Sequence, residues 1–184
     1  CNFSTTCCIM FVRGEHMTTL TEPAVVPQGQ NTAPLNFNHF KVAVAKQFEK
    51  MKAHFGAAKL KGKTVGVWGL AFEPRTDDMR EAPAVPLITA MLAAGMQVQA
   101  YDPEAAKVAK GIFGSKVSFA ATAYDAVKNA DCLAVVTEWN EFRRPDFERV
   151  KQLMRAPVIF DGRNLYAPEQ MKQSGFTYYS IGRH

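Results

Sequence analysis

A charged segment separates an apolar stretch from the next apolar helix of this sequence, within VWGLAFEPRTDDMREAP at positions 67–83. Its charged residues are Glu73, Arg75, Asp77, Asp78, Arg80 and Glu81. A connection between a strand and a helix is ordinarily short and needs one capping residue. An arginine can bind a phosphate through paired hydrogen bonds. The segment is therefore a candidate anion-binding loop. The alternative is that Asp77 and Asp78 only cap a helix starting near Ala82, with Arg80 and Glu81 in solvent.

Three further polar groups follow apolar stretches that read as strands. They are Tyr101-Asp102-Pro103, Thr137-Glu138-Trp139-Asn140 and Asp161-Gly162-Arg163-Asn164. Together with the first loop they bring arginines, aromatic rings and carboxylates to one edge, a set that suits a nucleotide or a sugar nucleotide. Structural alternatives remain open: Asp102 as a helix N-cap, Trp139 as a core residue, and Arg163 in an ion pair with Asp161 or Asp102.

Strand and helix patterns alternate along most of the chain and must position these groups. Strands are predicted at 64–72, 97–102, 117–120, 131–137, 157–162 and 177–182, and helices at 82–95, 103–113, 123–130, 143–154 and 167–175. Such alternation predicts an α/β fold, a Rossmann-like doubly wound parallel sheet with helices on both faces. In such sheets, ligands bind beyond the carboxyl ends of the strands, where the strand order reverses.

The N-terminal part of the chain differs in composition. Residues 1–34 are rich in Thr, Pro, Gln and Gly and predict an irregular or disordered tail. Residues 35–56 predict an amphipathic helix, with an apolar stripe of Phe37, Phe40, Val44, Phe48, Met51 and Phe55. A packed helix is favoured over a calmodulin-binding or membrane-surface helix. Residues 57–184 then form the Rossmann-like domain.

Several function classes are disfavoured by composition and by missing motifs. The net charge of +5 over 184 residues is mild and its basic residues are scattered, so no nucleic-acid partner is expected. No apolar run is long enough for a membrane span and no secretory signal is visible. Three of the four cysteines lie in the N-terminal segment and one in an apolar strand, which is neither a disulfide framework nor zinc spacing and favours a reducing, cytoplasmic setting. The four histidines are dispersed, so neither a metal cluster nor a catalytic triad is expected. G-x-G-x-x-G and Walker A loops are missing, which predicts binding without a reactive group of its own.

Four motifs in this order resemble the C-terminal, UDP-binding domain of the UDP-glucose/GDP-mannose dehydrogenase family. They are GLAFEPRTDDMREAP, VQAYDPEA, VVTEWNEFRRPDF and PVIFDGRNLY. The resemblance runs from about Leu60 to Arg183. It implies a nucleotide-sugar-binding domain of an NAD-dependent enzyme, with UDP-glucose oxidised to UDP-glucuronate as the favoured reaction. The helix at 35–56 resembles the end of the central helix that links the family's two Rossmann-like domains.

The resemblance also implies roles for individual residues. Phe72 and Glu73 belong to a loop over the nucleotide sugar, and Arg163 lies at the substrate. Arg80 reaches towards the NAD, which is held mainly by the N-terminal dehydrogenase domain or by a second chain. The full enzymes are expected to be homodimers.

This chain departs from the family pattern in three ways. Glu73 stands where the family usually has a lysine, and the helix segment Lys41–Val44 has no arginine for a neighbouring subunit. The catalytic cysteine motif and the dinucleotide fingerprint are missing. The chain alone is therefore expected to be inactive, as a fragment, a degenerate copy or one part of a split enzyme. A non-catalytic Rossmann-like binding or interaction module remains the alternative function.

Overall fold

The computed structural model describes residues 37–182, without the side chains of Phe37–Lys41, Ala43 and Val44. The tail predicted at 1–34, with Cys1, Cys7 and Cys8, lies outside the described residues. So do the side chains of Phe37, Phe40 and Val44 from the predicted stripe. The strands are β1 Thr64–Trp68, β2 Gln97–Tyr101, β3 Val117–Phe119, β4 Cys132–Val135, β5 Val158–Asp161 and β6 Thr177–Ser180.

The helices fall between the strands, as the alternating pattern predicts. The α-helices are α1 Phe37–Phe55, α2 Ala84–Ala93, α3 Ala106–Phe113, α4 Ala123–Val127, α5 Asn140–Arg143, α6 Phe147–Leu153 and α7 Pro168–Gln173. Two short 3₁₀ helices, η1 Ala57–Lys59 and η2 Gly114–Lys116, were not predicted.

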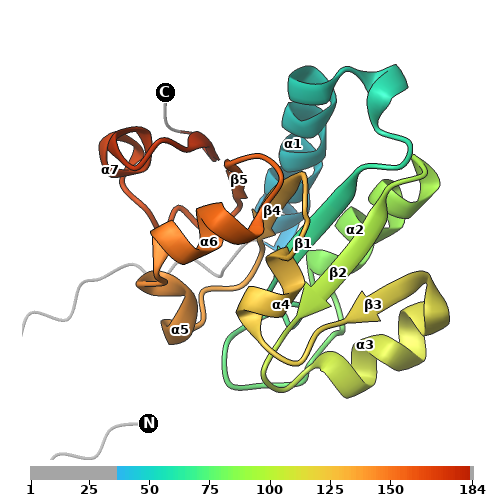
Figure 1. Ribbon diagram of the computed structural model, residues 1–184. Coiled ribbons are helices and arrows are strands. Elements are labelled where there is room, and N and C mark those ends of the chain that lie inside the picture. The colour runs from blue at the N-terminus through green and yellow to red at the C-terminus, as the bar shows by residue number, and fades with distance from the viewer. Residues whose placement is uncertain (1–36, 183–184) are drawn as a thin grey trace, which may run out of the picture. The chain divides into compact units, whose positions relative to one another are not determined.

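The six strands form one sheet in the order β3-β2-β1-β4-β5-β6, and every neighbouring pair is parallel (Figure 1). This is the Rossmann-like doubly wound α/β fold that the sequence predicts. The chain runs outward from β1 to β3 and then returns to place β4 on the other side of β1. The strand order therefore reverses between β1 and β4, and this is where such folds bind ligands.

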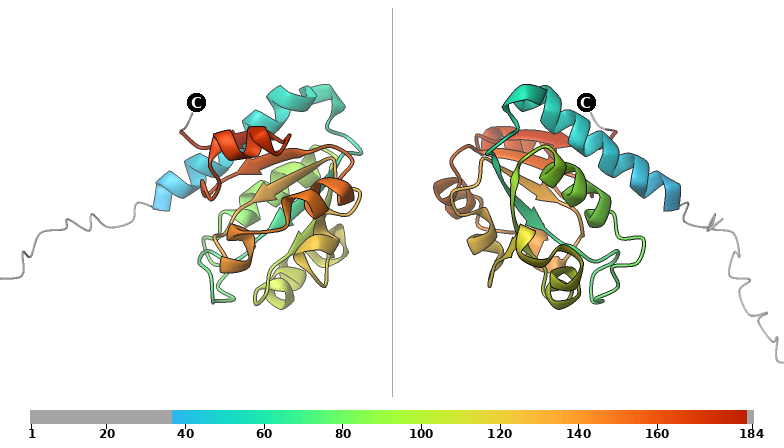
Figure 2. Two further views of the ribbon diagram at one scale, coloured as in Figure 1. Left: turned by 60° about the vertical axis from the view of Figure 1, so that its left-hand side comes forward. Right: turned by 90° about the vertical axis from the view of Figure 1, so that its right-hand side faces the viewer.

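Alternation along the central strands builds two cores, one on each face of the sheet. In β4, Cys132 and Ala134 pack into the cluster that includes Met51 of α1, Ile88 of α2 and Ala109 of α3. The intervening Leu133 and Val135 pack into the opposite cluster with residues of α4, α5, α6 and α7. Both faces are thus covered (Figure 2), which explains why the central strands are continuous apolar runs.

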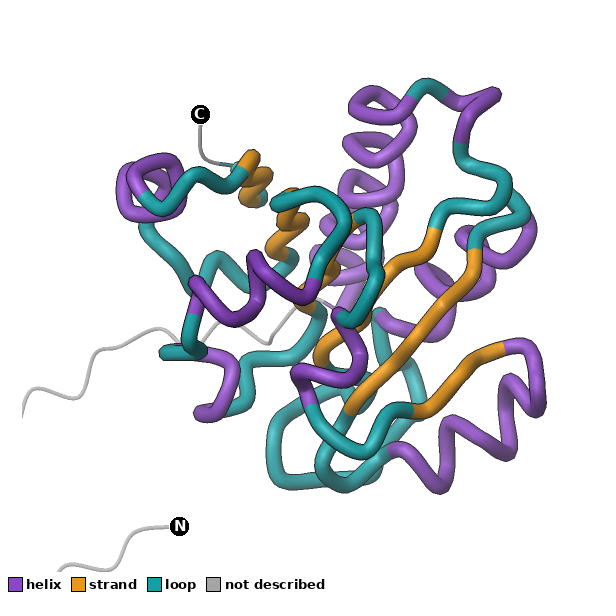
Figure 3. Tube along the Cα trace, in the orientation of Figure 1, coloured by secondary structure: helices purple, strands orange, loops and turns teal. Residues whose placement is uncertain are grey.

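The first predicted strand is too long. The chain leaves β1 after Trp68, and residues 69–83 form a loop that extends beyond the strand ends before α2 begins (Figure 3). Leu70 and Ala71 are nevertheless fully buried. Their apolar character suggested a continued strand. It instead reflects their burial at the start of the loop that follows β1.

The predicted helix at 143–154 is also corrected. Only α6, Phe147–Leu153, corresponds to it, and α5, Asn140–Arg143, is a separate short helix that was not predicted. Arg144-Pro145-Asp146 lies between the two helices. Proline disfavours helical backbone at the residue before it, and Arg144 has φ −139° and ψ 61°. Asp146 then caps α6 by accepting a hydrogen bond from the Arg149 amide at 3.0 Å.

The described part of the chain contains neither a membrane-spanning helix nor a metal-binding cluster. Within residues 37–182, no helix is both long and apolar enough to cross a bilayer. In the same range, no group of three or more His, Cys, Asp or Glu side chains is placed to hold a metal ion.

Candidate functional site

Asp102, at the end of β2, anchors the start of the 69–83 loop. Its side chain is buried, with 2% exposure. It accepts hydrogen bonds from the amides of Leu70 (2.7 Å), Ala71 (3.2 Å), Glu104 (2.9 Å) and Ala105 (2.8 Å), and from the Trp139 indole (3.2 Å). Helix α3 begins later, at Ala106, without a side-chain cap. Asp102 thus has two roles: its Oδ1 atom caps the turn that leads into α3, as the N-cap alternative expects, and its Oδ2 atom anchors the 69–83 loop. Trp139 is half-buried beside it.

The same loop lies directly against the end of β4. Gly69 has φ 88°, and a Cβ atom there would lie 2.6 Å from the Thr137 amide nitrogen. The buried Thr137 hydroxyl donates a hydrogen bond of 2.6 Å to the carbonyl of Ala71. The ends of β1, β2 and β4 are therefore fixed to one another at the reversal of strand order.

The outer part of the loop carries the predicted charges. The Phe72 amide donates to the Asp78 carbonyl at 3.0 Å and closes the lobe between them. Phe72 is half-buried against the core, and Glu73 is exposed. Helix α2 begins at Ala84 with no side-chain cap, so capping by Asp77 or Asp78 is wrong.

Asp78 instead forms an ion pair with Arg80 at the surface. The Nη2 atom of Arg80 lies 2.8 Å from Asp78 Oδ2, and its Nε atom lies 3.0 Å from Oδ1. These hydrogen bonds lower the pKa of Asp78 to about 2. The Arg80 side chain remains 90% exposed.

Arg163 is held at the end of β5 by its backbone and its side chain. Its amide donates a 2.8 Å hydrogen bond to the fully buried Asp161, which also accepts from the Leu165 amide at 2.7 Å. The guanidinium is 10% exposed and forms an ion pair with Glu138. The sequence placed both residues at strand ends but did not pair them. Because β4 and β5 are neighbours, these two strand ends meet.

The predicted site residues come from two loops. Phe72, Glu73 and Arg80 belong to the loop after β1, whereas Arg163 follows β5, and β4 lies between these strands. Sequence analysis missed Gln47 of α1, which is 1% exposed. Its Nε2 atom donates to the carbonyl of Phe160 at 2.8 Å and to that of Val135 at 3.3 Å. Gln47 could have been noticed in the sequence as a polar residue next to the apolar stripe of this helix.

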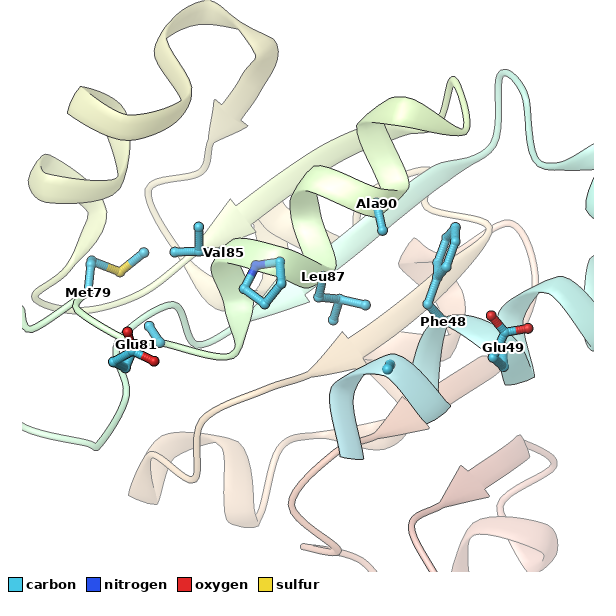
Figure 4. A pocket seen from close by; sticks show the side chains of 10 residues that line it. Phe48, Glu49, Met79, Glu81, Val85, Leu87 and Ala90 are labelled. Carbon is cyan, nitrogen blue, oxygen red and sulfur yellow. The ribbon is translucent and has the colours of Figure 1, made fainter. Parts of the chain in front are cut away.

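Two hollows border the loop. A groove of about 540 Å³ between α1 and α2 is lined mainly by apolar side chains, including Phe48, Met79 and Leu87, with Glu49 and Glu81 at its rim (Figure 4). Carboxylates on an apolar surface do not suit a diphosphate. A depression of about 620 Å³ lies between residues 76–80 and α3, where Val108 and Ile112 are exposed.

The first loop does not fit a dinucleotide as its own cofactor. A Rossmann dinucleotide site uses a short glycine-rich turn after the first strand and an acidic residue after the second. Here the turn is replaced by residues 69–83, and the acid after β2, Asp102, is buried and already accepts its hydrogen bonds from loop atoms. The loop after β1 therefore does not have the geometry of a Rossmann dinucleotide site.

Comparison with known proteins agrees with the geometry of this edge. The family model described as "UDP-glucose/GDP-mannose dehydrogenase family, UDP binding domain" matches residues 66–168, more than half of the chain. The chain belongs to this family. The matched range contains all four sheet-edge loops described above, from Gly69 to Arg163.

Relatives from the UDP-glucose/GDP-mannose dehydrogenase family are considerably longer than this chain. The UDP-glucose 6-dehydrogenase of Pseudomonas aeruginosa is 46% identical over 127 residues, covering 66% of this chain and 28% of that protein. The UDP-glucose 6-dehydrogenase TuaD of Bacillus subtilis is 39% identical over 147 residues, covering 77% and 32%. The chain thus spans about a third of the length of these relatives.

Solved structures show the same fold. A UDP-glucose dehydrogenase from Pyrobaculum islandicum superposes with a TM-score of 0.60 at 25% identity, over 79% of this chain and 29% of that one. An NDP-N-acetyl-D-galactosaminuronic acid dehydrogenase from Methanosarcina mazei gives a TM-score of 0.65 at 25% identity, over 88% and 34%. The relatives of this chain place it in an NAD-dependent dehydrogenase family.

Proposed function

We propose that this domain binds the nucleotide part of a UDP-sugar at the carboxyl edge of its sheet, with Arg163 as the main contact. The observation that carries the proposal is the placement of Arg163. A buried strand, the carboxylate of Asp161 and the ion pair with Glu138 fix it at the edge where parallel sheets bind ligands. An arginine held in this way presents its donors without a large loss of side-chain entropy.

The loop after β1 completes the proposed site. Phe72 supplies a half-buried ring, and Glu73 follows it on the exposed side of the loop. An anion at Glu73 repels the diphosphate and reduces the affinity. Arg80, exposed on the same loop, contacts NAD held mainly by another domain.

We further propose that the chain corresponds to the UDP-binding part of an NAD-dependent UDP-glucose 6-dehydrogenase that makes UDP-glucuronate in the cytoplasm. Its partner is the N-terminal dehydrogenase domain or a second chain, within a homodimeric enzyme. Exposed Val108 (38%) and Ile112 (48%) beside the Arg80 loop support a protein contact there. No nucleic-acid or membrane partner is part of this proposal.

A non-catalytic binding or interaction module is the second candidate. It is favoured by the exposed acid Glu73 and by the pairing of Arg80 with Asp78, since both weaken the attraction of this loop for anionic ligands. An interaction module that has lost the nucleotide site would not bind UDP.

The test is calorimetric titration of the full chain with UDP, for the wild type and for Arg163→Ala. We expect the substitution to weaken binding by roughly tenfold or more, as loss of a charged hydrogen bond implies. Arg155→Ala is the matched control, because Arg155 pairs with Asp131 next to the start of β4, at the opposite edge of the sheet. Its UDP affinity should equal that of the wild type. If Arg163→Ala only lowers the melting temperature and leaves affinity unchanged, the arginine is structural and the site assignment is wrong.

A further inference from the structure

Gln47 links helix α1 to two strand ends at the proposed site. Its Nε2 atom donates to the carbonyl of Phe160 in β5 at 2.8 Å and to that of Val135 in β4 at 3.3 Å. Its Oε1 atom is buried and has no hydrogen-bond partner among the described residues. A buried carbonyl oxygen without a partner is unfavourable. Stabilisation of the fold alone therefore does not explain why a glutamine occupies position 47.

The amide of Gln47 lies against Gly162, the residue before Arg163. A Cβ atom at Gly162 would lie 2.9 Å from Gln47 Nε2 and 3.0 Å from Oε1. Gly162 in turn donates its amide hydrogen to the Val135 carbonyl at 2.8 Å, the carbonyl that also accepts from Gln47. Gln47 and Gly162 thus share one acceptor, and their close approach sets where the chain leaves β5.

From these contacts we propose that Gln47 is a positioning residue for Arg163. The side chain of Gln47 determines the path of Gly162, and the path of Gly162 determines where the Arg163 guanidinium meets Glu138 and the ligand. The ligand in this statement is UDP, so this part rests on the function proposed above. The positioning itself concerns only the protein and can be measured without a ligand.

Other polar contacts of α1 reach β6 rather than the ends of β4 and β5. Lys50 binds the Ser180 carbonyl, and His54 Nδ1 lies 2.9 Å from the Tyr179 hydroxyl; both partners are in β6. These contacts dock the same helix onto the sheet, but they do not touch the turn at Gly162. They therefore supply a control in which α1 loses a hydrogen bond while the Arg163 turn is left intact.

The consequence is a coupling between α1 and the ligand site. Because the Gln47 side chain contacts the ends of β4 and β5 and lies against Gly162, a displacement of α1 would reach Arg163 through Gln47 and Gly162. By linkage, a ligand that needs Arg163 in place also favours the docked position of α1.

The experiment compares Gln47→Met with Tyr179→Phe in the full chain. Methionine keeps the length of the side chain but removes both hydrogen bonds, and it also removes the unpartnered oxygen, so the fold should tolerate it. Tyr179→Phe removes the hydroxyl that contacts His54 and keeps the ring stacked on Phe160. We expect UDP to bind Gln47→Met about three- to tenfold more weakly than the wild type, and Tyr179→Phe to bind as the wild type does.

A double-mutant cycle tests whether Gln47 acts through Arg163. If it does, Gln47→Met weakens UDP binding much less when Arg163 is already alanine. An equal fold-loss in both backgrounds, or an unchanged affinity of Gln47→Met, would overturn the proposal.

A second readout does not depend on UDP. The Nε–Hε NMR signal of Arg163, assigned by its disappearance in Arg163→Lys, reports the ion pair with Glu138. It should shift in Gln47→Met and stay in place in Tyr179→Phe. If the wild-type chain fails to bind UDP, the proposed function fails while this measurement still decides the positioning role. A signal that is identical in Gln47→Met and the wild type overturns the positioning role.

Discussion

At the scale of single residues, two arginines at the candidate edge are each met by a carboxylate, with different consequences. The Arg80–Asp78 pair is at the surface, with Arg80 90% exposed, and such pairs contribute little to stability. The Arg163–Glu138 pair is largely shielded, since Arg163 is 10% exposed. The Arg80–Asp78 pair restrains a solvent-exposed side chain, whereas the Arg163–Glu138 pair holds the Arg163 guanidinium in one orientation at the sheet edge.

The Arg80–Asp78 pair predicts an unusual titration. The pKa of Asp78 is lowered to about 2 by hydrogen bonds from Arg80. Because the folded-state pKa is depressed, the stabilisation is present above the ordinary pKa of about 3.8 and is lost as the pH falls through about 2. In Arg80→Met, the pKa of Asp78 should rise part of the way from about 2 towards 3.8, as measured by carboxyl ¹³C NMR, because the backbone amide of residue 80 still donates to the carboxylate. Arg75→Met is the control and should leave the titration of Asp78 unchanged. A pKa near 2 in Arg80→Met would mean that backbone groups of the 69–83 loop, rather than the arginine side chain, stabilise the Asp78 carboxylate.

Glu73 gives a second prediction at this scale. Glu73→Lys replaces an exposed anion on the 69–83 loop with a cation. UDP should bind roughly three- to fivefold more tightly at low salt, and the gain should shrink as salt is added, because exposed charges are screened. Glu148→Lys makes the same charge change on α6, over the other face of the sheet, and should change the affinity less. Equal effects of the two substitutions would show that Glu73 does not face the ligand.

At the scale of elements, the loop after β1 is the feature that separates this domain from a dinucleotide-binding one. Asp102 binds the amides of Leu70 and Ala71, and Thr137 binds the Ala71 carbonyl. The ends of three strands thus share one hydrogen-bond network. The acidic residue after β2 thus has a structural role. In the outer part of the loop Met79 is buried and Phe72 is half-buried, whereas Glu73, Arg75, Asp77 and Arg80 are exposed.

Gly69 tests the rigidity of that network. Its φ of 88° disfavours other residues, and an added Cβ would lie 2.5 Å from the Thr137 Cβ. Gly69→Ala should therefore lower the free energy of unfolding by about 3 kcal/mol or more, from combined backbone strain and steric overlap. Gly62→Ala is the matched control, because Gly62 has φ 80° but nothing within 4 Å of an added Cβ. Its cost should be about 1 kcal/mol from the backbone alone. Urea denaturation measures both, and similar losses would mean that the loop moves aside at little cost.

At the scale of the whole molecule, the polar groups that follow β1, β2, β4 and β5 gather at one edge of the sheet. Cys132 is the one cysteine in the described residues, and burial raises the pKa of its thiol, which makes it a poor nucleophile. The loop after β1 does not form a dinucleotide turn. The chain spans about a third of the length of these relatives.

The proposed function, in which this domain binds UDP and another domain holds NAD, predicts that the two ligands affect the chain differently. UDP at about a hundredfold its Kd should raise the melting temperature of the chain by several degrees, since binding to the folded state at that excess adds about 2.7 kcal/mol. NAD at the same concentration should not raise it. The chain alone should form no NADH from UDP-glucose and NAD above a control without protein. Stabilisation by NAD alone would contradict the assignment of the cofactor to another domain.

The sequence by itself determined the fold class and the edge of the molecule that bears the candidate site. Strands buried on both faces are continuous apolar runs, so β1, β4 and β5 could be located from local composition, whereas β2 shows alternating polar and apolar residues. Parallel strands present their carboxyl ends on one edge, so the polar residues after each run could be assigned to one surface. Both inferences depend on short stretches of chain, where local pattern is informative.

The tertiary structure alone decided which side chains meet. Arg163 and Glu138 are 25 residues apart, and Gln47 is 113 residues from Phe160. Strand order and helix docking create these contacts, and no local pattern encodes either. The end of β1 at Trp68 was missed for a related reason. Leu70 and Ala71 are buried by contacts with Asp102 and Thr137, so their apolar character has the same sequence signature as a continued strand.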